Sequence, residues 1–232
     1  MPRLCTCLFA LAVASAGCAS TQSIKYSLDQ VTAARAAPLP AALDVEVLAD
    51  QRSSVAENGI LFANDRDPTL DGKKLCINAE KHYEAGAVAR QVSEAIRAHL
   101  EKRGSFERVV LGNATEAKYQ LTGTLRRLYG SQEQSKSAKT GSYFGLIGAL
   151  ATAGAKTPGT IRIELVELAL VGKNGSVVAK LPDVTETFQG ELQADAYCWA
   201  IYSTVNEGLR RAVERLAEQV EREVERTAMP AG

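Results

Sequence analysis

The stretch AVARQVSEAIRAHLEKRGSFERVVL, residues 87–111, decides the fold of this chain. Apolar side chains recur every four residues in its first part, which places them on one stripe of an amphipathic helix predicted over residues 80–103. These side chains are Val88, Val92, Ile96 and Leu100. Gly104 would end the helix, and residues 106–111 are typical of a buried strand. A helix followed directly by a strand is typical of an α/β protein.

Extended segments on both sides of this stretch complete the predicted sheet. Leu43, Val45 and Val47 alternate with acidic residues, the pattern of a half-buried strand. The apolar phase shifts within residues 160–171, which predicts either a bulge or a strand buried on both faces. Asn174-Gly175 predicts a hairpin turn. The other expected extended segments are 118–129, 176–181 and 184–192, with a surface hairpin from the short apolar pieces 60–62 and 75–77.

A long helix over residues 195–226 closes the chain, with apolar residues on one stripe and mixed charges on the other face. Charges at three- and four-residue spacing are typical of a solvated helix surface. We therefore predict a single α/β (α+β) domain over residues 43–228. Its mixed, largely antiparallel sheet of five to six strands would be packed by two main helices.

The first eighteen residues have the layout of an export signal. Arg3 is followed by an apolar run over residues 8–13 and by small residues that lead into Cys18. The run is too short to cross a bilayer, which takes about 20 apolar residues. Small residues directly before a cysteine resemble the bacterial lipobox, in which the cysteine receives a diacylglyceryl group and becomes the new N-terminus. The sequence thus predicts a signal peptide over 1–17, lipidation at Cys18 and a tether over 18–42.

Ser15 and Ala19, on either side of Cys18, bear on where the exported protein would be located. Ser15 stands where the lipobox usually has Leu, Val or Ile, and Ala14-Ser15-Ala16 also fits ordinary signal peptidase. Cleavage before Gly17 would then release a soluble periplasmic or secreted protein. Ala19 is not the Asp that marks inner-membrane retention in many bacterial lipoproteins. A lipidated chain is therefore expected at the periplasmic face of the outer membrane.

The charge balance and the cysteine content indicate which ligands and which covalent links the protein can be expected to have. Lys plus Arg and Asp plus Glu both number 27, so no global field attracts nucleic acid. With Cys18 acylated and the signal removed, Cys76 and Cys198 would remain of the five cysteines. Two thiols in an oxidising periplasm suggest a disulfide, with two separately buried free cysteines as the alternative. The histidines His82 and His99 offer no ligand spacing, and no metal or cofactor is expected.

An apolar, glycine-rich insert spans residues 141–155. It could form a short helix over the end of the sheet, a segment that contacts the membrane or a second copy, or a disordered insert. It is too short to span a bilayer, but an interfacial helix is allowed. The candidate membrane or oligomer contacts are Phe144, Leu146, Ile147 and Leu150.

The familiar catalytic signatures are absent from the sequence. It lacks Gly-x-Ser-x-Gly, His-Glu-x-x-His, the phosphate-binding loop and the dinucleotide fingerprint. A protein without enzymatic activity is expected.

A few residues after Cys18 the chain has an aromatic-x-Leu strand opening, Tyr26-Ser27-Leu28-Asp29. Together with an acylated cysteine, this resembles the auxiliary lipoproteins of ABC-type lipid transport systems, which also run strand, helix, strands, hairpin and C-terminal helix. The chain departs from them where Lys81-His82-Tyr83-Glu84 replaces a Trp-Ala-x-Pro-like segment. The insert at 141–155 is a second departure and is similar to segments of other envelope lipoproteins, including those of secretion pores.

The resemblance implies an accessory or assembly subunit of an envelope transport complex, held to the membrane by its N-terminal lipid and bound to envelope proteins. The alternative is an oligomeric structural or pore-associated lipoprotein whose residues 141–155 contact the membrane.

Overall fold

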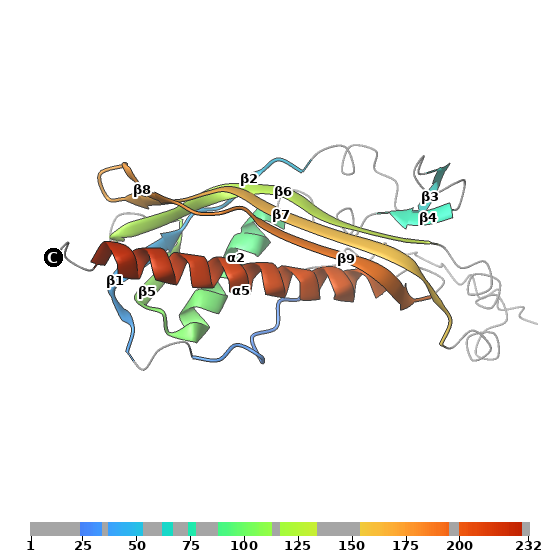
Figure 1. Ribbon diagram of the computed structural model, residues 1–232, viewed down its shortest axis with the longest axis horizontal. Coiled ribbons are helices and arrows are strands. Elements are labelled where there is room, and N and C mark those ends of the chain that lie inside the picture. Colours follow the sequence, from blue (N-terminus) through green and yellow to red (C-terminus); the bar gives the residue numbers. More distant parts are fainter. Residues whose placement is uncertain are drawn as a thin grey trace, which may run out of the picture.

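The computed structural model describes residues 24–33, 37–52, 88–112, 117–133, 154–194 and 200–228, and the backbone of 62–66 and 74–77. Within that part of the chain, one sheet of nine strands is packed by two helices (Figure 1). The strands are β1 (Leu39–Val45), β2 (Ala49–Asp50), β3 (Phe62–Arg66), β4 (Lys74–Ile77), β5 (Phe106–Leu111), β6 (Tyr119–Glu133), β7 (Lys156–Gly172), β8 (Val177–Lys180) and β9 (Val184–Gln193). The helices are α2 (Val88–Arg103) and α5 (Ala200–Ala228).

Two long strands, β6 and β7, pair antiparallel and form the middle of the sheet. On the other side of β6, β1 lies between β6 and β5 and runs parallel to both, while β2 and β4 pair with the rest of β6. β8 and β9 pair antiparallel with the far edge of β7. Three of the eight strand pairings are parallel, which confirms the predicted α/β (α+β) class and the mixed, largely antiparallel sheet. Nine strands are described rather than five or six, because the expected surface hairpin, β3 and β4, joins the sheet through β4 and because the short β2 was not predicted.

The two helices cover one face of this sheet and contact each other (Figure 1). α5 lies along β6, β7 and β9, and α2 lies against β5 and β1. The stripe predicted in the first helix is fully buried in α2, and α5 buries an equally regular stripe. The fully buried residues of these stripes are Val88, Val92, Ile96 and Leu100, and Val205, Leu209, Val213, Leu216 and Val220.

Two glycines let α5 lie close to the sheet. A Cβ atom at Gly130 of β6 would overlap the Cγ2 atom of Ile201 and lie 3.0 Å from Cγ2 of Val205. On the facing helix, a Cβ atom at Gly208 would lie 3.0 Å from Cδ1 of Ile163. The missing side chains therefore set the separation of the two layers.

Gly130→Ala is expected to lower the free energy of unfolding by about 1–3 kcal/mol, because overpacking forces side chains and backbone to shift. Gly208→Ala is the control, since its Cβ meets only the movable end of Ile163 and alanine favours the helix by about 1 kcal/mol. Urea unfolding followed by circular dichroism measures both variants. Equal losses at the two positions would contradict the account of Gly130.

The phase shift predicted in residues 160–171 is a β-bulge. Thr122 faces Ala169 and Thr124 faces Val166, so two residues of β7 lie opposite one of β6. Glu167, the first residue of the bulge, has a φ of 54°. The extra residue returns the apolar phase of β7 to the helix-covered face, which confirms the bulge.

The first strand differs from its prediction. Residues 43–47 were expected to be half-buried, but β1 begins at Leu39 and ends at Val45. Asp44 is fully buried and Val47 is 43% exposed. Asp44 lies on β1 between β5 and β6, and its carboxylate accepts a hydrogen bond from Nε2 of Gln120 on β6 at 3.4 Å.

The turn at Asn174-Gly175 joins β7 to β8, which confirms the predicted hairpin. Gly175 has a φ of 78°, and its N–H donates to the carbonyl of Gly172 at 2.8 Å, while the N–H of Gly172 donates to the carbonyl of Ser176 at 2.8 Å. This is a three-residue loop that ends in a left-handed glycine, not a two-residue turn.

The remaining predicted elements agree within the described residues. β3 and β4 pair antiparallel, as the expected surface hairpin requires. The beginnings of the two predicted helices, residues 80–87 and 195–199, lie outside the described residues.

Candidate functional site

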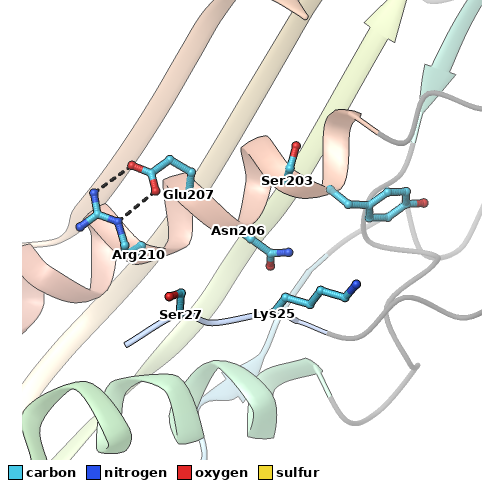
Figure 2. A pocket seen from close by; sticks show the side chains of 7 residues that line it. Lys25, Ser27, Ser203, Asn206, Glu207 and Arg210 are labelled. Atoms are coloured by element: carbon cyan, nitrogen blue, oxygen red, sulfur yellow. Dashed lines mark hydrogen bonds and ion pairs between the residues drawn. The ribbon is translucent and has the colours of Figure 1, made fainter. Parts of the chain in front are cut away.

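The described N-terminal segment is residues 24–33, and its residues 24–28 lie between α2 and α5 (Figure 2). Ile24 and Tyr26 pack against the core, and Val31 is 9% exposed. The backbone N–H of Ile24 donates to Oε1 of Gln91 on α2 at 3.2 Å. This part of the predicted tether is therefore bound to the folded domain.

Tyr26 is held by a buried histidine of α2. The Tyr26 hydroxyl and Nδ1 of His99 form a hydrogen bond of 2.7 Å, and the two rings meet edge to face with centroids 6.1 Å apart. His99 is 2% exposed, and among the described residues its Nε2 has no hydrogen-bond partner. Burial, and next the charge of Arg103, lower the pKa of His99 to about 4, and burial raises the pKa of Tyr26. Burial therefore favours the neutral form of the His99 imidazole.

A polar pocket of about 500 Å³ lies beside this segment, between it and the beginning of α5 (Figure 2). Its lining residues are Lys25, Ser27, Tyr202, Ser203, Asn206, Glu207 and Arg210. The guanidinium of Arg210 donates to both oxygens of Glu207, at 2.9 and 2.8 Å, and to Glu214 at 3.2 Å. These hydrogen bonds hold the pKa of Glu207 below its ordinary value. The pocket therefore places a fixed carboxylate–guanidinium pair beside the side chains of Lys25 and Asn206.

Tyr26→Phe is expected to lower the free energy of unfolding by about 1–2 kcal/mol, because it leaves Nδ1 of the buried His99 without its partner. Ser27→Ala is the control, because the Ser27 hydroxyl is exposed and bonds only with Asp29; its effect should stay within about 0.5 kcal/mol. Urea unfolding at neutral pH compares the two. Equal stability of the two variants would contradict the importance of the Tyr26–His99 bond.

Most of the candidate site residues predicted from the sequence lie outside the part of the chain that the structure describes. Cys18, Cys198 and the apolar residues of the 141–155 insert, Phe144, Leu146, Ile147 and Leu150, lie outside the described residues. The backbone of Cys76 lies in β4 opposite Gln132 of β6. Lipidation at Cys18, the Cys76–Cys198 disulfide and the membrane contact of the insert therefore stay predictions.

The pairing of Tyr26 with His99 was not predicted. Ile24, Tyr26 and Leu28 were recognised as an apolar alternation, and His99 was considered only as a metal ligand. His99 stands one position before Leu100 and three after Ile96, on the buried stripe of α2. A histidine on an apolar stripe needs a polar partner, and this was the signal available in the sequence.

Within the described part of the chain, neither helix combines the length and the apolarity that crossing a bilayer would require.

No protein-family model matches the chain, and no curated protein matches it. Solved structures do match. A Xanthomonas campestris protein assigned to family-model DUF330 has a TM-score of 0.51 at 14% identity, over 89% of this chain and 98% of that one. A PelC dodecamer from Paraburkholderia phytofirmans has a TM-score of 0.37 at 12% identity, over 80% and 95% of the two chains. A Caulobacter crescentus protein provisionally described as a lipoprotein has a TM-score of 0.32 at 16% identity, over 62% and 86%.

The likeness to the Xanthomonas campestris protein shows a shared fold. The other two superpose too loosely to carry an argument. What the comparison confirms is therefore the fold of the chain.

Proposed function

We propose that this protein is a lipid-anchored, periplasm-facing accessory or assembly subunit of an envelope transport complex, without enzymatic activity. The lipobox-like sequence before Cys18 supports the anchor, and Ala19 supports the outer membrane as its location. The shared fold with a DUF330 protein is consistent with this proposal.

The observation that carries the proposal is the docking of the N-terminal segment. The chain is bound to α2 from Ile24 onward, only six positions after Cys18. Six residues span at most about 20 Å. An acylated Cys18 would therefore hold the helix layer and the polar pocket close to the lipid headgroups, because the linker between the lipid and the folded domain is short.

This position explains how the protein would act. A lipid anchor restricts the domain to the membrane surface without spanning the bilayer. The docked residues 24–28, the polar pocket beside them and the paired charges of α5 then lie where membrane-embedded transport proteins are accessible. Their polar character suits protein partners bound reversibly.

Metabolic labelling with palmitate and membrane fractionation test the proposal. Cys18→Ser should abolish the label and move the protein out of the membrane fraction, while Cys76→Ser should keep both. Crosslinking of the membrane-bound form, followed by co-purification, then identifies the partner. Unchanged membrane retention of Cys18→Ser would overturn the anchor, and a wild-type chain that crosslinks to no envelope protein would overturn the accessory role.

A further inference from the structure

The strand β9 forms a long open edge of the sheet. It has ten residues and pairs with β7 over its whole length without a register shift (Figure 1). Within the described residues no strand pairs with its other edge, where one carbonyl, that of Thr185, lies 3.5 Å from Nη1 of Arg215. Six of its side chains are exposed in the full chain: Thr185, Thr187, Phe188, Gln189, Glu191 and Gln193.

This edge has few of the features that usually prevent strand addition, the inward-pointing Glu186 being one that it has. Proteins protect edge strands with proline, lysine, a bulge or a very short strand. β9 contains no proline and no basic residue, its ladder is regular, and it is about twice as long as a typical strand. The backbone groups on this edge have no strand partner among the described residues, and they therefore form a template for another strand.

An apolar surface lies at the centre of the edge. Phe188 is 37% exposed, and its ring lies over Gly190, where a Cβ atom would come within 2.8 Å of Cζ. A hollow of about 110 Å³ adjoins Phe188 between β9 and α5. Its wall combines Ile161 and Gly208 with polar and charged side chains, those of Glu186, Thr187, Thr204, Glu207 and Arg211. A strand added at β9 would cover Phe188 while the sheet continues.

We infer that a second copy of this chain pairs its β9 antiparallel with β9, about a two-fold axis at Phe188. Such an interface is self-complementary and closed, as most protein dimers are. The register about Phe188 sets Thr187 opposite Gln189 of the second copy. It also sets Thr185 opposite Glu191 and Glu186 opposite Gly190, so no carboxylate of the strand faces another. A parallel in-register pairing would instead set Glu191 beside Glu191.

The pairing does not depend on the lipid anchor, because β9 and Cys18 are separate parts of the chain. Membrane attachment and dimer formation can therefore fail independently.

Two double variants with the same added charge test the register. Thr187→Lys with Gln189→Lys sets lysines opposite each other twice across the axis, and like charges directly opposite destabilise a strand pair. Thr185→Lys with Gln193→Lys sets each new lysine opposite a carboxylate, Glu191 or Asp183 of the second copy. The first variant should weaken dimer formation by about tenfold or more, and the second should keep or tighten it.

The measurement uses the full-length chain in mild detergent, with light scattering across micromolar concentrations and circular dichroism to show that each variant is folded. Hydrogen exchange of the β9 amides should be slower in the wild-type dimer than in the Thr187→Lys, Gln189→Lys variant. A wild-type chain that stays monomeric overturns the dimer. A dimer that responds equally to both variants, or to neither, overturns the β9 pairing.

Discussion

Glu221→Ala is expected to lower the free energy of unfolding by about 3 kcal/mol, because it leaves a partly buried guanidinium without its carboxylate. Nε and Nη2 of Arg103 donate to the two oxygens of Glu221 at 2.8 and 3.0 Å, and the hydroxyl of the fully buried Ser105 also donates to Glu221. Glu221 is 8% exposed. The hydrogen bond with Glu221 raises the pKa of Arg103. This cluster joins the C-terminal end of α2 to α5.

Two further variants show whether the loss of stability comes from the unpaired charge of Arg103 or merely from removing a glutamate side chain of α5. Arg103→Met combined with Glu221→Leu should recover part of the stability, since an apolar pair of similar volume often replaces a buried ion pair without loss. Glu218→Ala, on the exposed face of the same helix, should cost less than about 0.5 kcal/mol, because its contact with Arg222 spans 4.0 Å in solvent. Urea unfolding at neutral pH measures all three. A Glu221→Ala chain as stable as Glu218→Ala would contradict the cluster's importance.

Acidification is expected to destabilise the protein through His99. Its pKa in the fold is about 4, below the ordinary value of 6.5, so the unfolded chain binds the proton more tightly. The stabilisation from a neutral His99 is therefore complete above pH 6.5 and is lost as the pH falls towards 4. This difference in pKa between the unfolded and the folded chain corresponds to a change in the free energy of unfolding on the order of 3 kcal/mol. The charged groups around His99 are Arg103 on its own helix and Arg210, Glu214 and Glu221 on α5, and Tyr26 faces it from the N-terminal segment.

The variant His99→Gln separates this effect from the titration of carboxylates. Glutamine can still bond with the Tyr26 hydroxyl but takes up no proton in this range. Its free energy of unfolding should change less between pH 6.5 and 4 than that of the wild-type chain. Thermal or urea unfolding across this pH range provides the comparison. Parallel pH profiles for the two proteins would show that His99 does not titrate as described.

Periodicity allowed the helix layer to be predicted. The four-residue spacing of Val88, Val92, Ile96 and Leu100 is dictated by burying one side of a helix, and all four are buried. The apolar phase shift of residues 160–171 likewise indicated either a bulge or a strand buried on both faces, and the structure has the bulge, at Glu167. Such patterns arise within a single helix or strand, so they can be recognised without knowing which elements pack against it.

The features that escaped prediction depend on residues far apart in the chain. The burial of Asp44 follows from the placement of β1 between β5 and β6, which alternation within residues 43–47 cannot reveal. The contact of Tyr26 with His99 joins positions 73 residues apart. An apolar alternation shows that a segment is half-buried, but it does not name the surface that buries it.

The candidate site was predictable only in part for the same reason. The sequence indicated an anchor at Cys18 and a tether after it, but a polar, proline-containing segment gives little sign of docking. Ile24 and Tyr26 dock because they pack against a core to which both α2 and α5 contribute, and this core exists only after the helices pack.

The most direct test of the account is the mass of the mature N-terminus. Protein isolated from membranes, denatured and digested with trypsin should release the peptide that runs from Cys18 to Lys25, with a diacylglyceryl group on the cysteine sulfur. That product would show that the docked segment begins a few residues from a lipid. A peptide that begins at Gly17 and carries an unmodified Cys18 would contradict the account.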